Sequence, residues 1–294
     1  MLPILHGAVS LGLLWALMTI GVFITYRVLD FSDLTVDGSL VTGAAIAARM
    51  ITDGANPYLA TGIAMLGGMA AGAATGLLHT KLKIPGLLSG ILTMIALYSI
   101  NIRIMGKANI SLLKIESVYT PLQAIGLSQK NAVLLLGVVC VFAIICALYW
   151  FFGTELGSAI RATGNNSGMI RAQGVNTDTM IIIGLIISNA LVALSGALIA
   201  QYQQYADIQM GTGSIVIGLA SVIIGEVLFG KRNFFNNLVS LALGAITYRI
   251  IIALVLELGM ETTDLKLFTA ITVALALAMP VAKEKLGKLK NKKR

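Results

Sequence analysis

Charged residues are scarce in this 294-residue chain. Asp, Glu, Lys and Arg make up only 12% of it, while 57% of its residues are hydrophobic. Soluble domains carry roughly 25% charged residues, because a surface in water has to be polar. A chain with about half that share cannot cover such a surface. The composition therefore excludes a soluble protein and predicts an all-α protein that crosses a membrane several times.

The residues that build catalytic and metal centres are also few. The two histidines, His6 and His79, have no acidic cluster near them in the sequence. Cys140 and Cys146 lie in one apolar run and are interpreted as small buried hydrophobic residues, not as a disulfide or metal pair. No Walker-type glycine loop, HExxH motif or nucleophile elbow occurs. We therefore expect no metal, no cofactor and no enzymatic reaction in this chain.

Long apolar runs dominate the chain instead. A helix needs about 20 apolar residues to cross the hydrocarbon core. Eight runs fit this requirement, and a shorter ninth, 38–48, lies between Asp37 and Arg49. The eight runs are residues 1–26, 57–80, 84–102, 131–154, 179–206, 208–230, 233–256 and 267–282. The sequence thus predicts eight or nine transmembrane helices in one domain, 1–282, followed by a basic tail, 283–294.

The basic residues predict the orientation. The tail holds seven of the 21 Lys and Arg residues, which is typical of a cytoplasmic segment next to a membrane. Counting back from a cytoplasmic C-terminus places the basic stretches GKRN (230–233) and TKLK (80–83) inside, as the positive-inside rule requires. The N-terminus lies outside if 38–48 is a complete span, and inside if 30–49 is re-entrant or broken. The net charge of +8 comes without interleaved aromatic residues, so no nucleic-acid partner is expected.

Glycines at a regular spacing mark one of the runs. Gly68, Gly72 and Gly76 recur every four residues and so line one face of a helix. Small residues at this spacing let two helix backbones approach closely. The pattern indicates either simple packing or an interface that moves.

One polar segment, RATGNNSGMIRAQGVNTD (161–178), interrupts the apolar sequence. Gly164 is expected to end one helix, and Asn165 or Asn166 to cap another. The following SGMIRAQ is long enough for about two helical turns, and Gly174 is expected to close them in a left-handed conformation. We predict a short helix along the cytoplasmic face, which is either an interfacial helix without a partner or a docking surface.

This segment and the run after it resemble a known family. GSAIRATGNNSGMIRAQGVNTD followed by IIIGLIISNALVALSGALIAQYQQYADIQMG is similar to permease subunits of ATP-binding-cassette (ABC) importers, and more narrowly to the branched-chain amino acid and ribose permeases. LDFSDLTVDGSLVTGAA (29–45) resembles the second-span region of a branch associated with aromatic amino acids. The likeness covers about residues 13–282. It implies the ABC importer permease fold in the cell membrane.

The resemblance also implies partners. A separate ATPase would bind ATP with Mg²⁺ and supply the energy, a second permease copy would enclose the pathway, and an extracellular binding protein would dock near 107–130 and 203–213. Membrane lipid surrounds the helices. The polar segment would be the coupling helix that docks on the ATPase. The expected ATPase-coupling residues are Arg161, Gly164, Asn165, Asn166, Met169, Ile170, Arg171, Gln173 and Gly174.

Several polar residues are candidates for the solute pathway. Asp33 and Asp37 form either an Asx-type cap and turn or a polar lining of the pathway. Glu226 is either a pathway group or a side chain that reaches the membrane–water interface, and the same two alternatives hold for Arg249. Interhelical hydrogen bonds explain the remaining three equally well. The candidates are Asp33, Asp37, Tyr98, Asn101, Ser221 and Glu226.

The resemblance favours import of an amino acid, with aromatic ones first. A nucleoside or sugar comes second, since the loop GEVLFGKRN (225–233) is poorer in glycine than in sugar permeases. The alternative function is a single-chain secondary transporter or channel. That alternative requires an ionisable group at mid-membrane and gives the polar segment no docking role.

Overall fold

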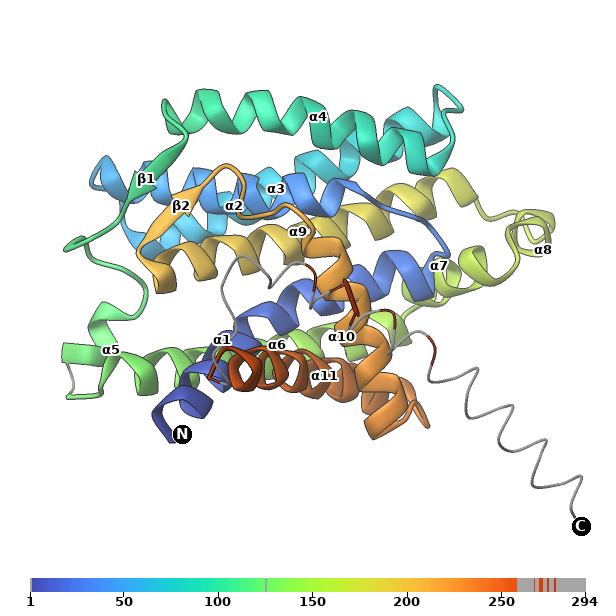
Figure 1. Cartoon of the computed structure of the whole chain (residues 1–294). Helices are drawn as coiled ribbons and strands as arrows, with labels where there is room; N and C mark the ends of the chain where they lie inside the picture. The colour runs from blue at the N-terminus through green and yellow to red at the C-terminus, as the bar shows by residue number, and fades with distance from the viewer. Residues whose placement is uncertain are drawn as a thin grey trace, which may run out of the picture.

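A computed structural model of the chain describes residues 2–124 and 126–257, together with 267, 270, 271, 274 and 278. The long helices are α1 (Leu2–Phe23), α2 (Thr35–Thr52), α3 (Pro57–Thr80), α4 (Gly86–Met105), α6 (Gln129–Gly153), α9 (Thr177–Gln203), α10 (Ser214–Phe229) and α11 (Phe234–Glu257). The shorter elements are the π-helix η1 (Ile24–Val28), strand β1 (Asn109–Ser111), helices α5 (Thr120–Ala124), α7 (Glu155–Asn165) and α8 (Ser167–Ala172), and strand β2 (Tyr205–Asp207). Figure 1 shows their arrangement.

The predicted all-α membrane fold is confirmed. Seven of the eight long apolar runs correspond to helices, namely α1, α3, α4, α6, α9, α10 and α11. Within the described residues, six helices are long and apolar enough to cross a membrane, and α10 is a shorter apolar helix. The last predicted run, 267–282, lies mostly outside the described residues, and the tail 283–294 lies entirely outside them.

The shorter ninth run, 38–48, is part of a complete helix. α2 continues for 18 residues, of which 13 are buried, and it packs against α3, α4 and α9. A helix enclosed by other helices does not need the apolar composition of one that faces lipid. Because α2 is enclosed, it can contain polar residues such as Ser39 and Thr42. These residues shortened the apolar run by which the sequence predicts a membrane-spanning helix. The N-terminus consequently lies at the end of the bundle opposite α7 and α8 (Figure 1).

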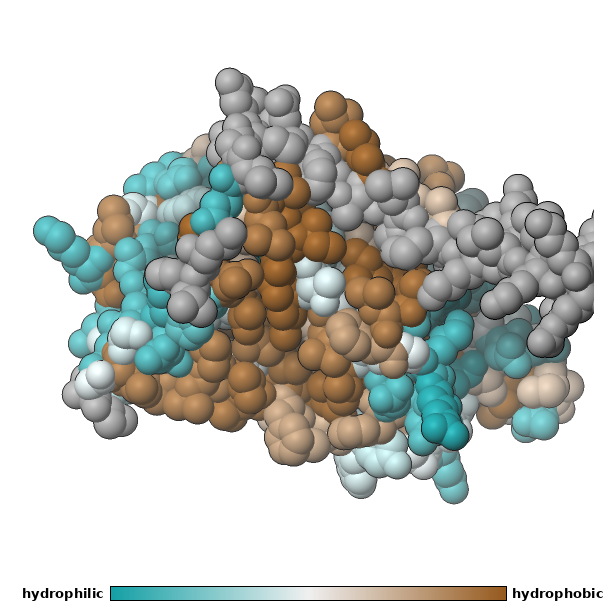
Figure 2. Space-filling view, turned by 60° about the horizontal axis from the view of Figure 1, so that its bottom comes forward, coloured by the Kyte–Doolittle hydropathy of each residue, from teal (hydrophilic) through white to brown (hydrophobic). Residues whose placement is uncertain are grey.

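The outer helices carry the lipid-facing surface. The most apolar 18-residue stretch is 83% buried in the first span but only 28% buried in α4. Large apolar side chains such as Ile95 of α4, Phe142 of α6 and Leu254 of α11 are exposed. Figure 2 shows an apolar band across the face at the bottom of Figure 1, with hydrophilic residues gathered at its two ends. This distribution matches a bundle that spans a bilayer.

Glycines bring α9 close to its neighbours. A Cβ placed at Gly68 of α3 would overlap the carbonyl oxygen of Asn189, and one at Gly72 would overlap that of Leu185. The spaced glycines of α3 therefore pack against the backbone of α9, as small residues do between membrane helices.

The predicted run 208–230 is wrong at its start. Residues 208–213 follow β2 as turns, Gly213 has φ of 81°, and α10 begins only at Ser214. Gly211 packs directly on the backbone of Asp37 in α2, so this turn enters the bundle instead of staying at the membrane surface. β2 itself pairs antiparallel with β1, with Ile110 opposite Ala206.

Candidate functional site

The predicted coupling segment folds as two helices, α7 and α8. Thr154 caps α7, its Oγ1 accepting from the Gly157 N–H at 3.3 Å. Gly164 lies inside α7, so the prediction that it ends a helix is wrong. A Cβ at Gly164 would overlap the carbonyl oxygen of Val28. Glycine is needed here because α7 and the π-helix η1 touch backbone to backbone.

α8 is a separate turn of helix with its own caps. Asn166 caps it, its Oδ1 accepting from the Met169 N–H at 2.9 Å, whereas Asn165 is the last residue of α7. Gly174 follows with φ of 85°, the left-handed conformation predicted for the end of this helix. These residues make α8 a compact projection at one end of the bundle (Figure 1).

The side chains of this segment divide into an outer and an inner set. Ile170 packs inward and is 7% exposed, whereas Met169 is 48% exposed. Arg161 lies over the ring of Phe234 at 5.5 Å, and Arg171 donates to Thr177 Oγ1 at 2.7 Å. The outward-facing surface is formed by Asn165, Asn166, Ser167, Gly168, Met169, Arg171, Ala172, Gln173 and Gly174.

Asp33 is the centre of a buried polar network. It is 2% exposed, and it accepts from the Thr35 N–H at 2.9 Å and from Asn189 Nδ2 at 2.8 Å. The Oδ1 atom of Asn189 in turn accepts from Ser39 at 2.6 Å. The Asx-type turn considered for Asp33 is present, and Asn189 is a partner that the sequence did not single out.

We expect Asn189→Leu to destabilise the bundle by about 2–3 kcal/mol, because it leaves the buried Asp33 carboxyl and the Ser39 hydroxyl without their shared partner. Thermal unfolding in detergent measures the loss. Thr247→Val is the control, since it removes an exposed hydroxyl that, among the described residues, donates to the Leu243 carbonyl of its own helix. Equal unfolding temperatures for the two variants would contradict the role given to Asn189.

Asp37 caps a helix that is distant in sequence. Its Oδ2 accepts from the Gly213 N–H at 2.9 Å, and its Oδ1 accepts from Ser214 Oγ at 2.8 Å and from the Ile215 N–H at 2.9 Å. A carboxylate at a helix N-terminus satisfies free N–H groups and complements the helix dipole. Asp37 of α2 thus fixes the start of α10 inside the bundle.

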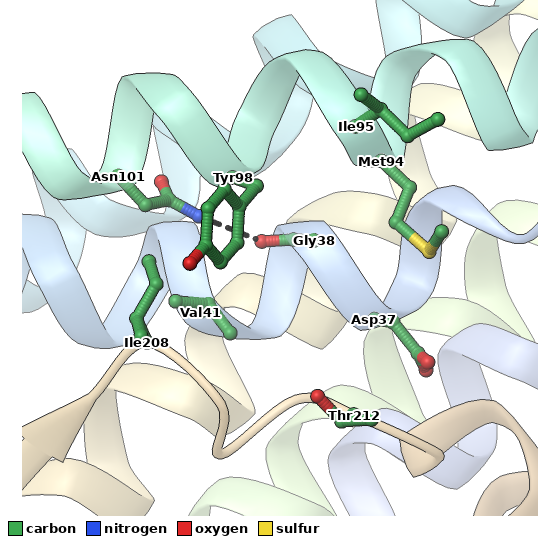
Figure 3. A pocket seen from close by; sticks show the side chains of 9 residues that line it. All are labelled: Asp37, Gly38, Val41, Met94, Ile95, Tyr98, Asn101, Ile208 and Thr212. Carbon is green, nitrogen blue, oxygen red and sulfur yellow. Dashed lines mark hydrogen bonds between the residues drawn. The ribbon is translucent and has the colours of Figure 1, made fainter. Parts of the chain in front are cut away.

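A cavity of about 400 Å³ opens beside this cap, between α2, α4 and the turn before α10 (Figure 3). Three predicted pathway residues, Asp37, Tyr98 and Asn101, lie together in its wall. Asn101 is 1% exposed, and its Nδ2 donates to the Gly38 carbonyl oxygen at 3.3 Å. The lining residues are Asp37, Gly38, Val41, Met94, Ile95, Tyr98, Asn101, Ile208 and Thr212.

The other pathway candidates lie elsewhere. Asp33 and Ser221 are buried outside this cavity, and the Ser221 hydroxyl donates to the Ile217 carbonyl at 2.8 Å. Glu226, near the end of α10, pairs with Arg27 of η1 at 2.7 Å and with Lys231 at 3.8 Å. Arg27 had no signal in the sequence, because it follows the first apolar run like any flanking residue.

Arg249 of α11 is partly buried and stacks on α1. Its guanidinium is 4.0 Å from the ring centroid of Trp15, which lies well inside α1. The stacking is a cation–π contact, which is strongest where water is excluded. Across the described residues, no group of three His, Cys, Asp or Glu side chains could hold a metal ion.

Comparison with known proteins identifies the family. The family model described as "Branched-chain amino acid transport system / permease component" matches residues 4–281. The chain belongs to this family. The resemblance found in the sequence is thereby confirmed, and the chain is a permease of an ABC-type transport system. Membership implies an ATPase partner and a substrate-binding protein.

Individual relatives of this permease agree. The tyrosine transport system permease protein of Clostridioides difficile (strain R20291) is 43% identical over 267 residues, covering 91% of this chain and 88% of the relative. The ribose import permease protein RbsC of Escherichia coli (strain K12) is 24% identical over 217 residues, covering 70% and 65%. A solved ABC transporter in an inward-facing conformation aligns with a TM-score of 0.52 at 14% identity, covering 96% and 85%. The solved structure supports the fold alone.

Proposed function

We propose that this permease imports an amino acid, with tyrosine and other aromatic amino acids first, when a partner ATPase docks on α8. The observation that carries this proposal is the exposed outer surface of α8 at one end of the bundle, in a chain that belongs to a permease family. The substrate class is supported by the 43% identity to a tyrosine transport permease. ATP and Mg²⁺ bind in the ATPase, and this chain carries out no covalent chemistry.

The end of the bundle that carries α7 and α8 is cytoplasmic in this proposal. The basic turn at Lys83 lies there, since Lys83 pairs with Asp178 at the start of α9 at 3.3 Å. The turn with Lys231 lies there as well, beside Glu226 and Arg27. Short basic loops favour the cytoplasmic side. The N-terminus is then extracellular, and the C-terminus with its tail 283–294 is cytoplasmic.

A route for coupling starts at α7. α7 touches η1 at Gly164, and η1 carries Arg27, which pairs with Glu226 of α10. α10 begins at the cavity, where Asp37 holds its first turn. ATP binding in the ATPase would move α7 and α8. These contacts would transmit the movement to the cavity, so that the bundle switches between two packing states.

A second copy of the permease completes the pathway. The cavity faces the side of α4 on which Tyr98 is 51% exposed. A second copy placed against α4 would enclose the cavity in a homodimer. The binding protein docks at the opposite end from α8, near β1 and β2.

The coupling role is tested at Met169, because its side chain is apolar and 48% exposed. The exposed Arg171 also donates to Thr177, and Arg161 stacks on Phe234, so changes at either arginine would disturb their own chain as well. We expect Met169→Glu to reduce co-purification of the ATPase at least tenfold, since a charge in an apolar docking contact is unfavourable. The control is Leu113→Glu, which places the same charge on a side chain that is 64% exposed near β1. Equal retention by both variants would overturn the docking surface.

The alternative function predicts a different result. A single-chain secondary transporter would drive uptake from an ion gradient without the ATPase. Glu226, the ionisable candidate of that alternative, is held by Arg27 and Lys231. Uptake into liposomes that contain only this chain and an ion gradient would support the alternative and contradict import by ATP.

A further inference from the structure

The cavity beside Asp37 is lined by polar groups that include an acidic side chain but no basic one. It offers a carboxylate, an amide and the hydroxyls of Tyr98 and Thr212, but no Lys, Arg or His is among its lining residues. The remaining side chains of the wall are apolar. A cavity with acceptors and an apolar wall suits a ligand that has hydrogen-bond donors on an apolar body.

Asp37 keeps part of its accepting capacity. A carboxylate has about four lone-pair positions for hydrogen bonds. The α10 cap uses three of them, two on Oδ1 and one on Oδ2. Oδ2 can therefore accept a further bond from a group in the cavity, and a cationic donor makes the stronger bond to a carboxylate.

Asn101 presents an acceptor without a donor. The side chain is 1% exposed, and its Oδ1 has no hydrogen-bond partner among the described residues. Buried acceptors are nearly always paired, so an unpaired one at a cavity points to a donor that a ligand supplies. In Figure 3, Asp37 and Asn101 lie toward opposite ends of the lining, with Val41 between them.

We propose that this cavity is a transit site of the permease that selects a primary ammonium group on an aromatic or other apolar body. The ammonium donates to Asp37, and a hydroxyl at the other end of the solute donates to Asn101 Oδ1. The apolar body lies against Val41, Met94, Ile95, Tyr98 and Ile208. The inference rests on the proposed import function and adds that the permease itself, and not only the binding protein, discriminates among solutes.

The transit site is expected to bind three related small molecules with different affinities. Tyrosine and its decarboxylated analogue tyramine both carry the ammonium and the hydroxyl, and both bind. Tyramine binds at least as tightly, because no basic side chain of the wall pairs with a carboxylate. The deaminated analogue 3-(4-hydroxyphenyl)propanoate lacks the ammonium, so it loses the bond to Asp37 and leaves its own carboxylate uncompensated near that charge. It therefore binds at least tenfold more weakly than tyrosine.

The test uses the full chain in nanodiscs of phosphatidylcholine and ligand-observed saturation-transfer NMR with these three compounds and with phenylalanine. Empty nanodiscs give the background. Asn101→Leu is expected to weaken the binding of tyrosine about five- to tenfold. The binding of phenylalanine, which lacks the hydroxyl, should stay unchanged. Asn237→Leu is the matched control, because the Asn237 Oδ1 is also buried without a partner in the described part of the chain but Asn237 does not line the cavity.

The possible results separate this site from the proposed function. The transit site is overturned if the deaminated acid binds as well as tyrosine, if no compound binds up to about 20 mM, or if Asn101→Leu behaves like Asn237→Leu. ATP-driven uptake of tyrosine by the assembled wild-type transporter is measured in parallel. If tyrosine is taken up but the cavity does not discriminate among the compounds, only the transit site is contradicted. If tyrosine is not taken up, the import function is contradicted.

Discussion

Gly196→Val is expected to prevent the accumulation of folded permease in the membrane. Gly196 of α9 and Gly43 of α2 face each other's helices at the same crossing. A Cβ at Gly196 would overlap the carbonyl oxygen of Leu40, and a Cβ at Gly43 would overlap that of Ala193. Because both obstacles are backbone atoms, no side-chain rotation can relieve the overlap. The two central helices would have to separate.

Separation of α2 and α9 would affect more than one contact. The Ser39–Asn189–Asp33 network joins the same two segments, with bonds of 2.6 and 2.8 Å, and these bonds would lengthen together. Overpacking alone removes about 1–3 kcal/mol, and loss of the network removes a similar amount. The sum, about 2–6 kcal/mol, reaches the lower end of the stability of many domains, which is about 5–15 kcal/mol.

Size-exclusion chromatography of a fluorescent fusion measures this effect as loss of the monodisperse peak. Gly62→Val is the matched control, because a Cβ at Gly62 of α3 would have no atom of the described residues within 4 Å. Valine there should leave the peak intact. If Gly196→Val also gave a wild-type peak and unfolding temperature, the α2–α9 crossing would be looser than described.

The sequence predicted the parts of the fold that face lipid. The runs that became α3, α4, α6 and α11 are free of charge or nearly so because their outer sides lie in hydrocarbon, and this requirement is visible residue by residue. α2 was hidden because other helices surround it, so its composition follows packing and internal hydrogen bonds. The early start given to α10 has a similar cause, since apolar residues such as Ile208 continue into a turn that lies within the bundle.

The candidate site was only partly predictable. The α8 caps follow from local rules, so Asn166 and Gly174 could be identified from a few neighbouring residues. Asp37 bonds to residues about 176 positions away, and Asn189 joins Asp33 across 156 positions. A single sequence carries no signal for such pairs, because either partner alone looks like an ordinary polar residue in a helix. The ion pair of Arg27 with Glu226 was hidden for the same reason.

Asp37→Leu has the second large expected effect. The substitution leaves the N–H groups of Gly213 and Ile215 and the Ser214 hydroxyl without their acceptor, in a partly buried place beside the cavity. Each unpaired buried donor costs about 1–3 kcal/mol, so the first turn of α10 should unwind. We expect tyrosine uptake to fall at least tenfold and amide hydrogen exchange in 208–220 to rise, while α8 still retains the ATPase.

Asp37→Asn separates the cap from the charge. Asparagine caps helices about as well as aspartate, and its Oδ1 can still accept from Ser214 and Ile215, although its Nδ2 would face the Gly213 N–H. We therefore expect exchange in 208–220 to stay close to wild type, whereas binding of tyramine weakens because the negative charge is gone. Wild-type exchange and uptake in Asp37→Leu would show that α10 does not depend on this cap. Fast exchange in Asp37→Asn as well would show that the start of α10 depends on the full carboxylate, with its charge and both oxygens, because asparagine keeps only one of the two accepting oxygens.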